Sequence, residues 1–150
     1  LLTGKARPVL QISGDLWPVD ADENGLAELL RHLIENADEA MPEGGNIHIG
    51  TKFHAASNTE SNNIGNRSGK VDILIRDDGP GIPEEIKRHL FEPLYSSKKE
   101  GHSGLGLSIV RNIVKEIGGN VTCETSLQAG TTFIITLPAA SEKVTNSPGG

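Results

Sequence analysis

Apolar residues recur at helical spacing in two segments of the chain. In the first segment they fall at intervals of three and four residues, at Leu26, Leu30, Leu33, Ala37 and Met41. This spacing predicts a helix over 26–41 with one buried face. A capping pair, Asp20 and Glu23, is expected to start the helix, and Pro42 with the glycines after it is expected to end it.

The second segment, 105–117, carries apolar residues every four positions, at Leu105, Ile109, Ile113 and Ile117. It predicts another amphipathic helix, which Gly118 and Gly119 end. Pro83 opens a short helix that is expected to reach Phe91. Alternating apolar and polar residues predict strands at 46–53, 71–79, 120–126 and 131–138, and 8–13 is predicted to be a short strand.

These elements follow one another as strand, helix, strands, two helices and strands. The order predicts an α+β fold: a two-layer α/β sandwich with a mixed, mostly antiparallel sheet and helices on one face. Residues 8–138 are expected to form one domain, after an interdomain linker remnant at 1–7 and before a disordered tail at 139–150. Two stretches without periodicity are interpreted as a polar insert at 55–69 and a flexible lid at about 93–104.

Composition narrows the class of protein. The chain has 150 residues and a formal net charge of −6, which argues against general nucleic-acid binding. No apolar run is long enough to cross a bilayer, and no signal peptide opens the sequence. Cys123 is the only cysteine, so an internal disulfide is excluded and a reducing compartment is favoured. A cytoplasmic location is therefore expected, and it is compatible with a membrane-anchored parent protein.

Asn36 is the first candidate for chemistry. It falls at the border of the buried face of the first helix, beside a polar stripe through Glu28, His32, Glu35 and Glu39. A neutral amide among acidic neighbours suits a hydrated Mg²⁺, which takes oxygen ligands and keeps several waters. The alternative is an asparagine that hydrogen-bonds locally on an ordinary amphipathic helix.

Two glycine-containing segments are candidates for a nucleotide site. In DDGPGI, Asp77 ends a strand and glycines follow at alternate positions, so a flat ligand could approach closely while the carboxylate accepts from an exocyclic amine. A plain Asp-Gly turn is the alternative. In GHSGLGLSIV, a glycine loop runs into a helix whose free N–H groups could bind an anion, or the loop simply precedes a core helix. The spacing excludes a Walker A loop and a Rossmann fingerprint.

Taken together, the segments resemble the ATP-binding catalytic domain of sensor histidine kinases, a branch of the Bergerat-fold ATPases. ENADEAM resembles the N box of that family, DDGPGI its first glycine box, and LFEPLYSSK its F box. GHSGLGLSIV resembles the second glycine box and GTTFIITLP the closing strand. The resemblance spans about residues 8–138.

The resemblance implies a role for each matching residue. Asn36 would bind Mg²⁺ and Asp77 would read the adenine amine, while Lys98 would lie near the γ-phosphate. Phe91 and Tyr95 match positions that anchor the lid. The remaining cofactor-binding residues implied by the motifs are Gly79, Gly81, Ile82, Gly104, Leu105, Gly106, Leu107 and Thr131.

Two histidines depart from the family pattern. His32 lies one turn before Asn36, where these kinases often place a second asparagine near the metal. The resemblance therefore makes His32 a second expected metal ligand beside Asn36. Imidazole is a softer ligand than Mg²⁺ prefers. His102 stands where a glycine is common.

The implied activity is transfer of the γ-phosphoryl group of Mg-ATP to a histidine on a separate dimerisation domain. Glu35 or Glu28 could polarise that histidine, and the sequence does not choose between them. No histidine of the chain has the phosphoacceptor context, so a parent protein, expected to be a homodimer, would supply it and pass the group to a response-regulator receiver domain. The alternative is a non-kinase ATP-gated clamp or nucleotide-binding regulatory module of the same fold.

Overall fold

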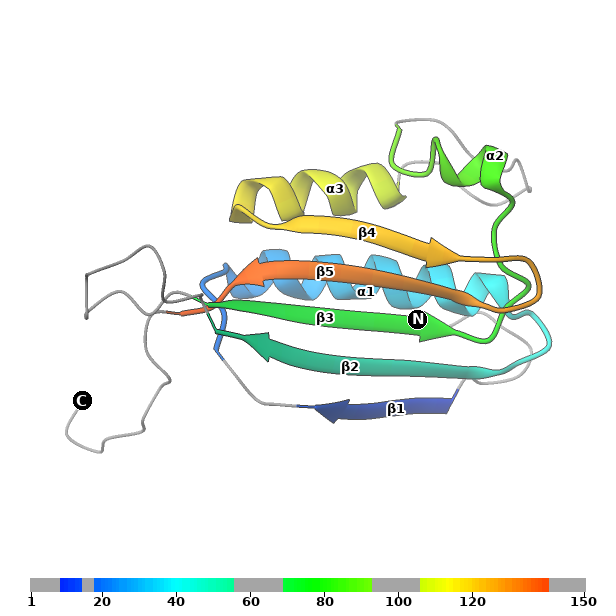
Figure 1. Cartoon of the computed structure of the whole chain (residues 1–150), viewed down its shortest axis with the longest axis horizontal. Coiled ribbons are helices and arrows are strands. Elements are labelled where there is room, and N and C mark those ends of the chain that lie inside the picture. Colours follow the sequence, from blue (N-terminus) through cyan, green and yellow to red (C-terminus); the bar gives the residue numbers. More distant parts are fainter. Residues whose placement is uncertain (1–8, 15–17, 56–68, 93–105, 141–150) are drawn as a thin grey trace.

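A computed structural model describes residues 9–14, 18–55, 69–92 and 106–140. It contains five strands and three helices along this part of the chain (Figure 1). The strands are β1 (Val9–Gly14), β2 (Asn46–His54), β3 (Lys70–Asp77), β4 (Asn120–Thr125) and β5 (Thr131–Pro138). The helices are α1 (Glu23–Ala40), α2 (Glu84–Lys87) and α3 (Gly106–Ile117). Each predicted strand and long helix is present, with ends displaced by up to three residues, whereas α2 stops at Lys87 and turns replace the rest of the helix predicted to reach Phe91.

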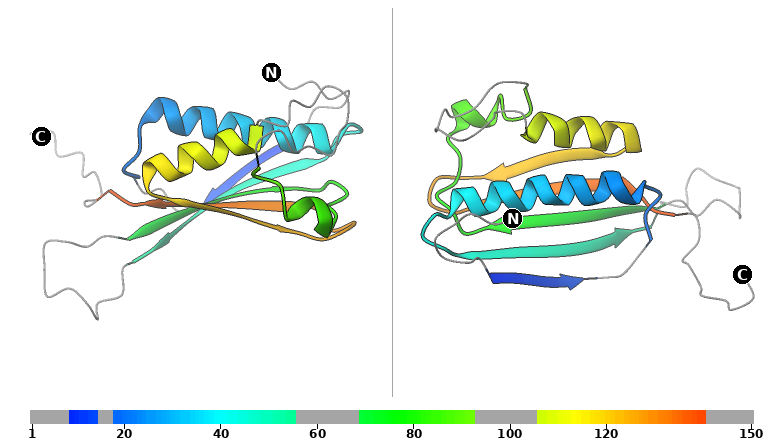
Figure 2. Two further views of the ribbon diagram at one scale, coloured as in Figure 1. Left: turned by 90° about the horizontal axis from the view of Figure 1, so that it is seen from above. Right: turned by 180° about the vertical axis from the view of Figure 1, so that it is seen from behind.

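The strands form one sheet in the order β1-β2-β3-β5-β4. β1 and β2 pair in parallel because α1 carries the chain back between them, whereas the other three pairs are antiparallel. Figure 2 shows α1 and α3 side by side on one face of this sheet. The predicted two-layer sandwich with a mixed sheet is therefore confirmed.

The core lies between the sheet and the two long helices. Alternate residues of β3 and β5 point into it, and the centre of the α1 face is Leu29, Leu33 and Ala37. Leu29 was not among the predicted core positions, whereas Leu26 and Leu30 are only half-buried. Apolar residues cover a wide arc of α1, and the sequence alone does not locate the middle of that arc.

The predicted start of α1 was wrong by two residues. Asp22 is the N-cap, and its Oδ2 accepts a hydrogen bond of 3.0 Å from the Gly25 N–H. Asp20 instead donates its backbone N–H to the Pro138 carbonyl oxygen at 3.0 Å. The strand-like segment before the helix is thus tied to the end of β5, which fixes where α1 begins.

The end of the described chain also differs from the expected boundary at Pro138. Ala139 is 7% exposed and forms an isolated bridge with Val19, and Ala140 N–H donates to the Pro18 carbonyl oxygen at 2.9 Å. The rest of the expected tail (141–150), most of the polar insert (56–68) and the lid (93–104) lie outside the described residues. Within the described residues, no helix has the length and apolar character that a membrane crossing requires.

Candidate functional site

Three polar side chains lie next to one another across the sheet, at one end of the apolar core. Asp77 of β3 is the register partner of Thr131 of β5, which in turn pairs with Thr125 of β4. Asp77 and Thr131 continue the inward-facing series of their strands, and both are buried, at 2% and 4% exposed. Where these strands end, the apolar core therefore gives way to a carboxylate and two hydroxyls.

The Asp77 carboxylate is held by the backbone around it. Its Oδ1 accepts from the Gly79 N–H at 2.8 Å, and the backbone of Thr131 also hydrogen-bonds to it. Burial raises the pKa of Asp77 above the ordinary 3.8; the two backbone hydrogen bonds oppose this rise, and the charge of Asp78 adds to it. The result is a fixed, poorly solvated acceptor, suited to pairing with a ligand N–H.

Close backbone approaches shape the segment after Asp77. Gly81 has φ +81°, and a Cβ there would overlap the carbonyl oxygen of Ser126 in the β4–β5 turn. Gly130 has φ +79°, and a Cβ there would overlap the Asp77 carbonyl oxygen. Glycine is needed at both positions, because only a residue without a Cβ adopts this φ easily and leaves room for the neighbouring backbone. The structure thus shows which backbone segment Gly81 contacts: the Ser126 carbonyl group.

Thr125 is a site residue that the sequence analysis missed. Its Oγ1 accepts from the Ile82 N–H at 2.9 Å, donates to the Gly130 carbonyl oxygen at 3.1 Å and lies 2.9 Å from Thr131 Oγ1. One hydroxyl thus connects the segment after Asp77 to the β5 strand. The alternation in 120–126 placed Thr125 on the inward face, but its partners depend on strand register and on the β4–β5 turn.

Replacing Thr125 with valine should loosen this corner without changing its shape. The Ile82 N–H would lose its partner, and we expect the free energy of unfolding to fall by about 1–2 kcal/mol. Nucleotide affinity should fall about fivefold, since 1 kcal/mol corresponds to roughly that factor. Chemical denaturation and nucleotide titration would check this; Thr122→Val, an exposed change on the same strand, is the control. Equal effects from both variants would contradict the role of Thr125.

Asn36 lies close to this row along α1. A Cβ at Gly79 would lie 3.1 Å from the carbonyl oxygen and 3.2 Å from the Cβ of Ala40, so the segment after Asp77 packs on the last turn of α1. Asn36 is four residues before Ala40, about 6 Å along the axis, and is half-buried. The structure therefore brings the predicted metal ligand and the predicted base-reading acid to the same half of one helix.

The N-terminal end of α3 faces the middle of α1. The helices run antiparallel side by side (Figures 1 and 2), and Gly25 near the start of α1 contacts Ile113 of α3. Both helices rise 1.5 Å per residue, so seven residues on from this contact His32 comes opposite Gly106. The N-terminal end of α3, an expected anion site, thus lies beside the polar stripe of α1.

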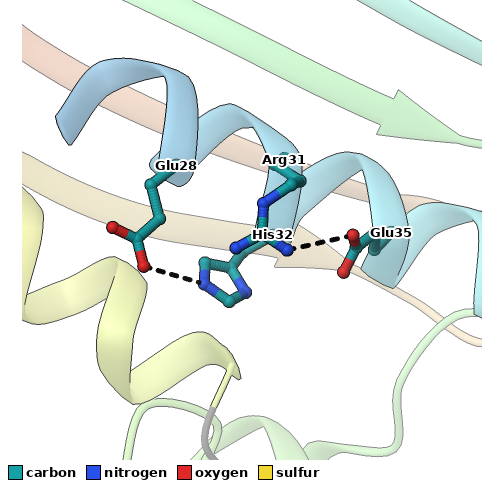
Figure 3. A network of polar contacts seen from close by, with 4 residues as sticks. All are labelled: Glu28, Arg31, His32 and Glu35. Atoms are coloured by element: carbon teal, nitrogen blue, oxygen red, sulfur yellow. Dashed lines mark hydrogen bonds and ion pairs between the residues drawn. The ribbon is translucent and has the colours of Figure 1, made fainter. Parts of the chain in front are cut away.

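Two contacts occupy that stripe (Figure 3). Glu35 Oε1 accepts from Arg31 Nη1 at 3.1 Å, an exposed pair spaced i, i+4. His32 Nε2 lies 3.6 Å from Glu28 Oε1, beyond hydrogen-bonding distance. Glu35 is thus already engaged with a cation, whereas the close contact of Glu28 within the described chain is a histidine.

The remaining predicted residues are distributed as follows. Leu107 in the first turn of α3 packs against the core, and Phe91 meets Phe133 edge-on at a centroid distance of 6.3 Å, so the chain is anchored just before the lid. Gly106 is the first residue of α3. Lys98, Gly104, Leu105, Tyr95 and His102 lie outside the described residues.

A divalent cation fits the described part of this site through few protein ligands. Asn36 and His32, whose Nε2 has no partner among the described residues, lie on one stripe of α1, one turn apart. The described residues contain no group of three or more His, Cys, Asp or Glu side chains that could hold a metal alone. Phosphate oxygens and water would complete the coordination, as is usual for Mg²⁺ with nucleotides.

Cys123 contributes no nucleophile. It is half-buried and packs against the core, and burial raises the pKa of its thiol to about 11. The thiolate needed for nucleophilic or redox chemistry is therefore scarce at neutral pH.

Comparison with known proteins agrees with this geometry. A family described as "Histidine kinase-, DNA gyrase B-, and HSP90-like ATPase" matches residues 21–141. Sensor kinase CckA of Brucella abortus is 37% identical over 132 residues, covering 86% of this chain and 14% of its own. Sporulation kinase C of Bacillus subtilis is 34% identical over 124 residues, covering 83% and 26%. The chain thus spans about a quarter or less of these curated relatives.

Among solved structures, the nucleotide-free catalytic domain of histidine kinase ThkA superimposes with a TM-score of 0.70 at 30% identity. The match covers 89% of this chain and 80% of that one. The buried acid, the glycine contacts and the helix start therefore occur on a backbone shared with a kinase catalytic domain. The chain belongs to the family of histidine kinase-, DNA gyrase B- and HSP90-like ATPases, as an ATP-binding catalytic domain of the sensor histidine kinase type.

Proposed function

We propose that this domain binds Mg-ATP and donates the γ-phosphoryl group to a histidine on a separate dimerisation domain of its parent protein. One observation carries the proposal: the buried Asp77, the half-buried Asn36 and the start of α3 all lie along the middle and last turns of α1. These groups match the base, metal and phosphate ends of a nucleotide. The family resemblance and the kinase relatives support the same assignment.

The base end of the site selects adenine by hydrogen-bond polarity. Asp77 is an acceptor, so it pairs with the exocyclic amine of adenine and repels the carbonyl oxygen that guanine carries at that position. Gly79 and Thr131 fix the carboxylate, which reduces the entropy lost on binding. Ile82 and Thr131 then border the base, and Thr125 holds these two segments together.

The phosphate end depends on electrostatics. The α3 N-terminus supplies N–H donors and the positive end of the helix dipole, and Asn36 with His32 faces the metal. The bound cation would offset the negative charge that develops on the γ-phosphoryl group during transfer. In this proposal Lys98 in the lid adds a further positive charge, and Gly104, Leu105, Gly106 and Leu107 line the phosphates.

The acceptor side belongs to the parent protein. Glu35 pairs with Arg31 at the surface and Glu28 lies beside His32, so both carboxylates remain candidates to polarise the incoming imidazole. We propose a homodimeric, cytoplasmic arrangement of this domain, with a response-regulator receiver domain as the next acceptor. No nucleic acid takes part, given the net charge of −6.

The test is phosphoryl transfer in trans. The chain is mixed with the helical dimerisation region of its parent protein and ATP labelled at the γ-phosphate, and the label should appear on histidine as an acid-labile, alkali-stable adduct. Asn36→Ala should lower cation-dependent nucleotide affinity at least about tenfold and abolish labelling, because a metal ligand is lost. Asn112→Ala, an exposed change on α3, should leave both unchanged. Nucleotide binding without any transfer would instead indicate a regulatory module.

A further inference from the structure

His32 carries a buried ring nitrogen that has no partner among the described residues. Its Nε2 is shielded from solvent and has no hydrogen-bond partner within the part of the chain that the structure describes. The Glu28 Oε1 atom is 3.6 Å away, beyond hydrogen-bonding distance (Figure 3). A buried polar atom without a partner destabilises the folded protein, so this position is expected to have a ligand.

The location of His32 indicates which ligand. It lies opposite Gly106, at the start of α3, and one turn before Asn36 on the same face of α1. The imidazole therefore borders the place proposed for the phosphates and the cation.

The charges of α1 favour a cation over a bare phosphate as the partner of the His32 nitrogen. The helix has a single basic residue, Arg31, and Arg31 is paired with Glu35. Its acidic residues are Glu23, Glu28, Glu35, Asp38 and Glu39. A triphosphate placed against this helix would be repelled unless a cation lies between them. His32 and Glu28 are on the side where that cation is needed.

We propose that His32 Nε2 is a direct ligand of the nucleotide-bound cation and makes this site prefer Mn²⁺ to Mg²⁺. The inference rests on the proposed function, because phosphate oxygens must supply further ligands. Mg²⁺ strongly prefers oxygen, whereas imidazole suits first-row transition metals, and Mn²⁺ also accepts carboxylate, carbonyl and phosphate oxygens. Asn36 and His32 together form a mixed oxygen and nitrogen pair, which favours Mn²⁺.

Glu28 fits the same cation. Two ligand atoms about 2.1 Å from one metal ion lie about 3.0–3.4 Å apart at octahedral or tetrahedral angles. The 3.6 Å between Glu28 Oε1 and His32 Nε2 is close to that spacing. Glu28 thus adds a carboxylate oxygen, or holds one of the cation's waters, beside the imidazole.

The first measurement compares cations by calorimetry, using the methylene-bridged ATP analogue AMPPCP with Mg²⁺ or Mn²⁺. The native chain should bind the Mn²⁺ complex at least about tenfold more tightly, corresponding to about 1.4 kcal/mol. His32→Asn, which restores an oxygen donor, should reduce that ratio below about threefold. His54→Asn, which alters another histidine paired with a carboxylate on the far face of the sheet, should leave the ratio unchanged.

The second measurement detects the bond between the cation and the His32 nitrogen directly. Pulsed EPR of the Mn²⁺–AMPPCP complex should show ¹⁴N coupling from a coordinated imidazole in the native chain and in Glu28→Gln, and none in His32→Asn. Equal affinities for the two complexes without nitrogen coupling would overturn the inference while leaving the proposed function intact. Tight binding of metal-free AMPPCP would also overturn it, by showing direct imidazole–phosphate contact. Failure to bind AMPPCP with either cation would instead contradict the proposed function.

Discussion

Replacing Asp77 with asparagine should lower affinity for adenine nucleotides about 100-fold while leaving the fold as stable as before or more so. The oxygen of the substituted amide can still accept from the Gly79 N–H, but the amide then presents N–H groups to the adenine amine. The variant loses a charge-assisted hydrogen bond and places the amide N–H donors against the adenine amine. Together these changes weaken the binding free energy by about 3 kcal/mol. Nucleotide titration by calorimetry measures the loss.

The expected effect of Asp77→Asn on stability follows from the pKa. Burial raises the pKa of Asp77 in the folded state, so the ionised carboxylate opposes folding as pH rises through that value. At pH 7 the asparagine variant avoids this cost and should melt at the same or a higher temperature. The difference from the native chain should shrink as pH falls toward about 4, where the aspartate is increasingly protonated in both states.

A neighbouring variant controls for local disturbance. Asp78→Asn alters an exposed side chain whose oxygen accepts from the Asn46 N–H, and the amide keeps that acceptor. It should change nucleotide affinity less than about threefold, since the lost charge is exposed. If Asp77→Asn and Asp78→Asn were equivalent in binding, Asp77 would not be the base-reading residue.

Replacing Gly81 with alanine should lower the free energy of unfolding by about 2–4 kcal/mol, because two costs combine. The φ of +81° disfavours any residue with a Cβ, and the new Cβ would overlap the Ser126 carbonyl oxygen, which belongs to backbone and cannot rotate away. The melting temperature should fall by about 10 °C, and nucleotide binding should weaken because the segment carrying Ile82 moves.

Gly118 provides the matched control for Gly81. It has φ +85° at the end of α3, but nothing lies within 4 Å of the position of its Cβ. Gly118→Ala therefore carries the φ cost alone, about 1 kcal/mol, and should not affect nucleotide binding. Equal losses of stability in the two variants would show that the contact with Ser126 does not matter.

The residues that sequence patterns identified are those whose role depends on local order. Asp77 ends a strand with clear alternation, Gly79 and Gly81 follow it, and Asn36 lies at a definite angle on a helix, so their positions relative to an element could be predicted. Such patterns locate a residue along one helix or strand. They predicted where Asn36 and Asp77 lie on their elements, but not which residues each of them contacts.

Other roles depend on contacts between distant elements and could not be predicted from the sequence. Thr125 acquires three partners only through the pairing of β4 with β5 and the turn that Gly81 approaches. Asp22 rather than Asp20 caps α1 because Asp20 is tied to the end of β5. The burial of the His32 nitrogen depends on what other parts of the chain pack against α1. In each case the residue type is ordinary, and only the tertiary neighbour gives it its role.

The central claim is that Asn36, Asp77 and the start of α3 surround one nucleotide. The most direct test is an NMR titration of isotopically labelled protein with AMPPCP and Mn²⁺-free Mg²⁺, in which the backbone amide chemical shifts are followed. The signals of Asn36, Gly79, Thr131 and Gly106 should all move and should fit one dissociation constant. Shifts confined to one of these segments, or located on the outer sheet face around His54 and Leu74, would contradict the account.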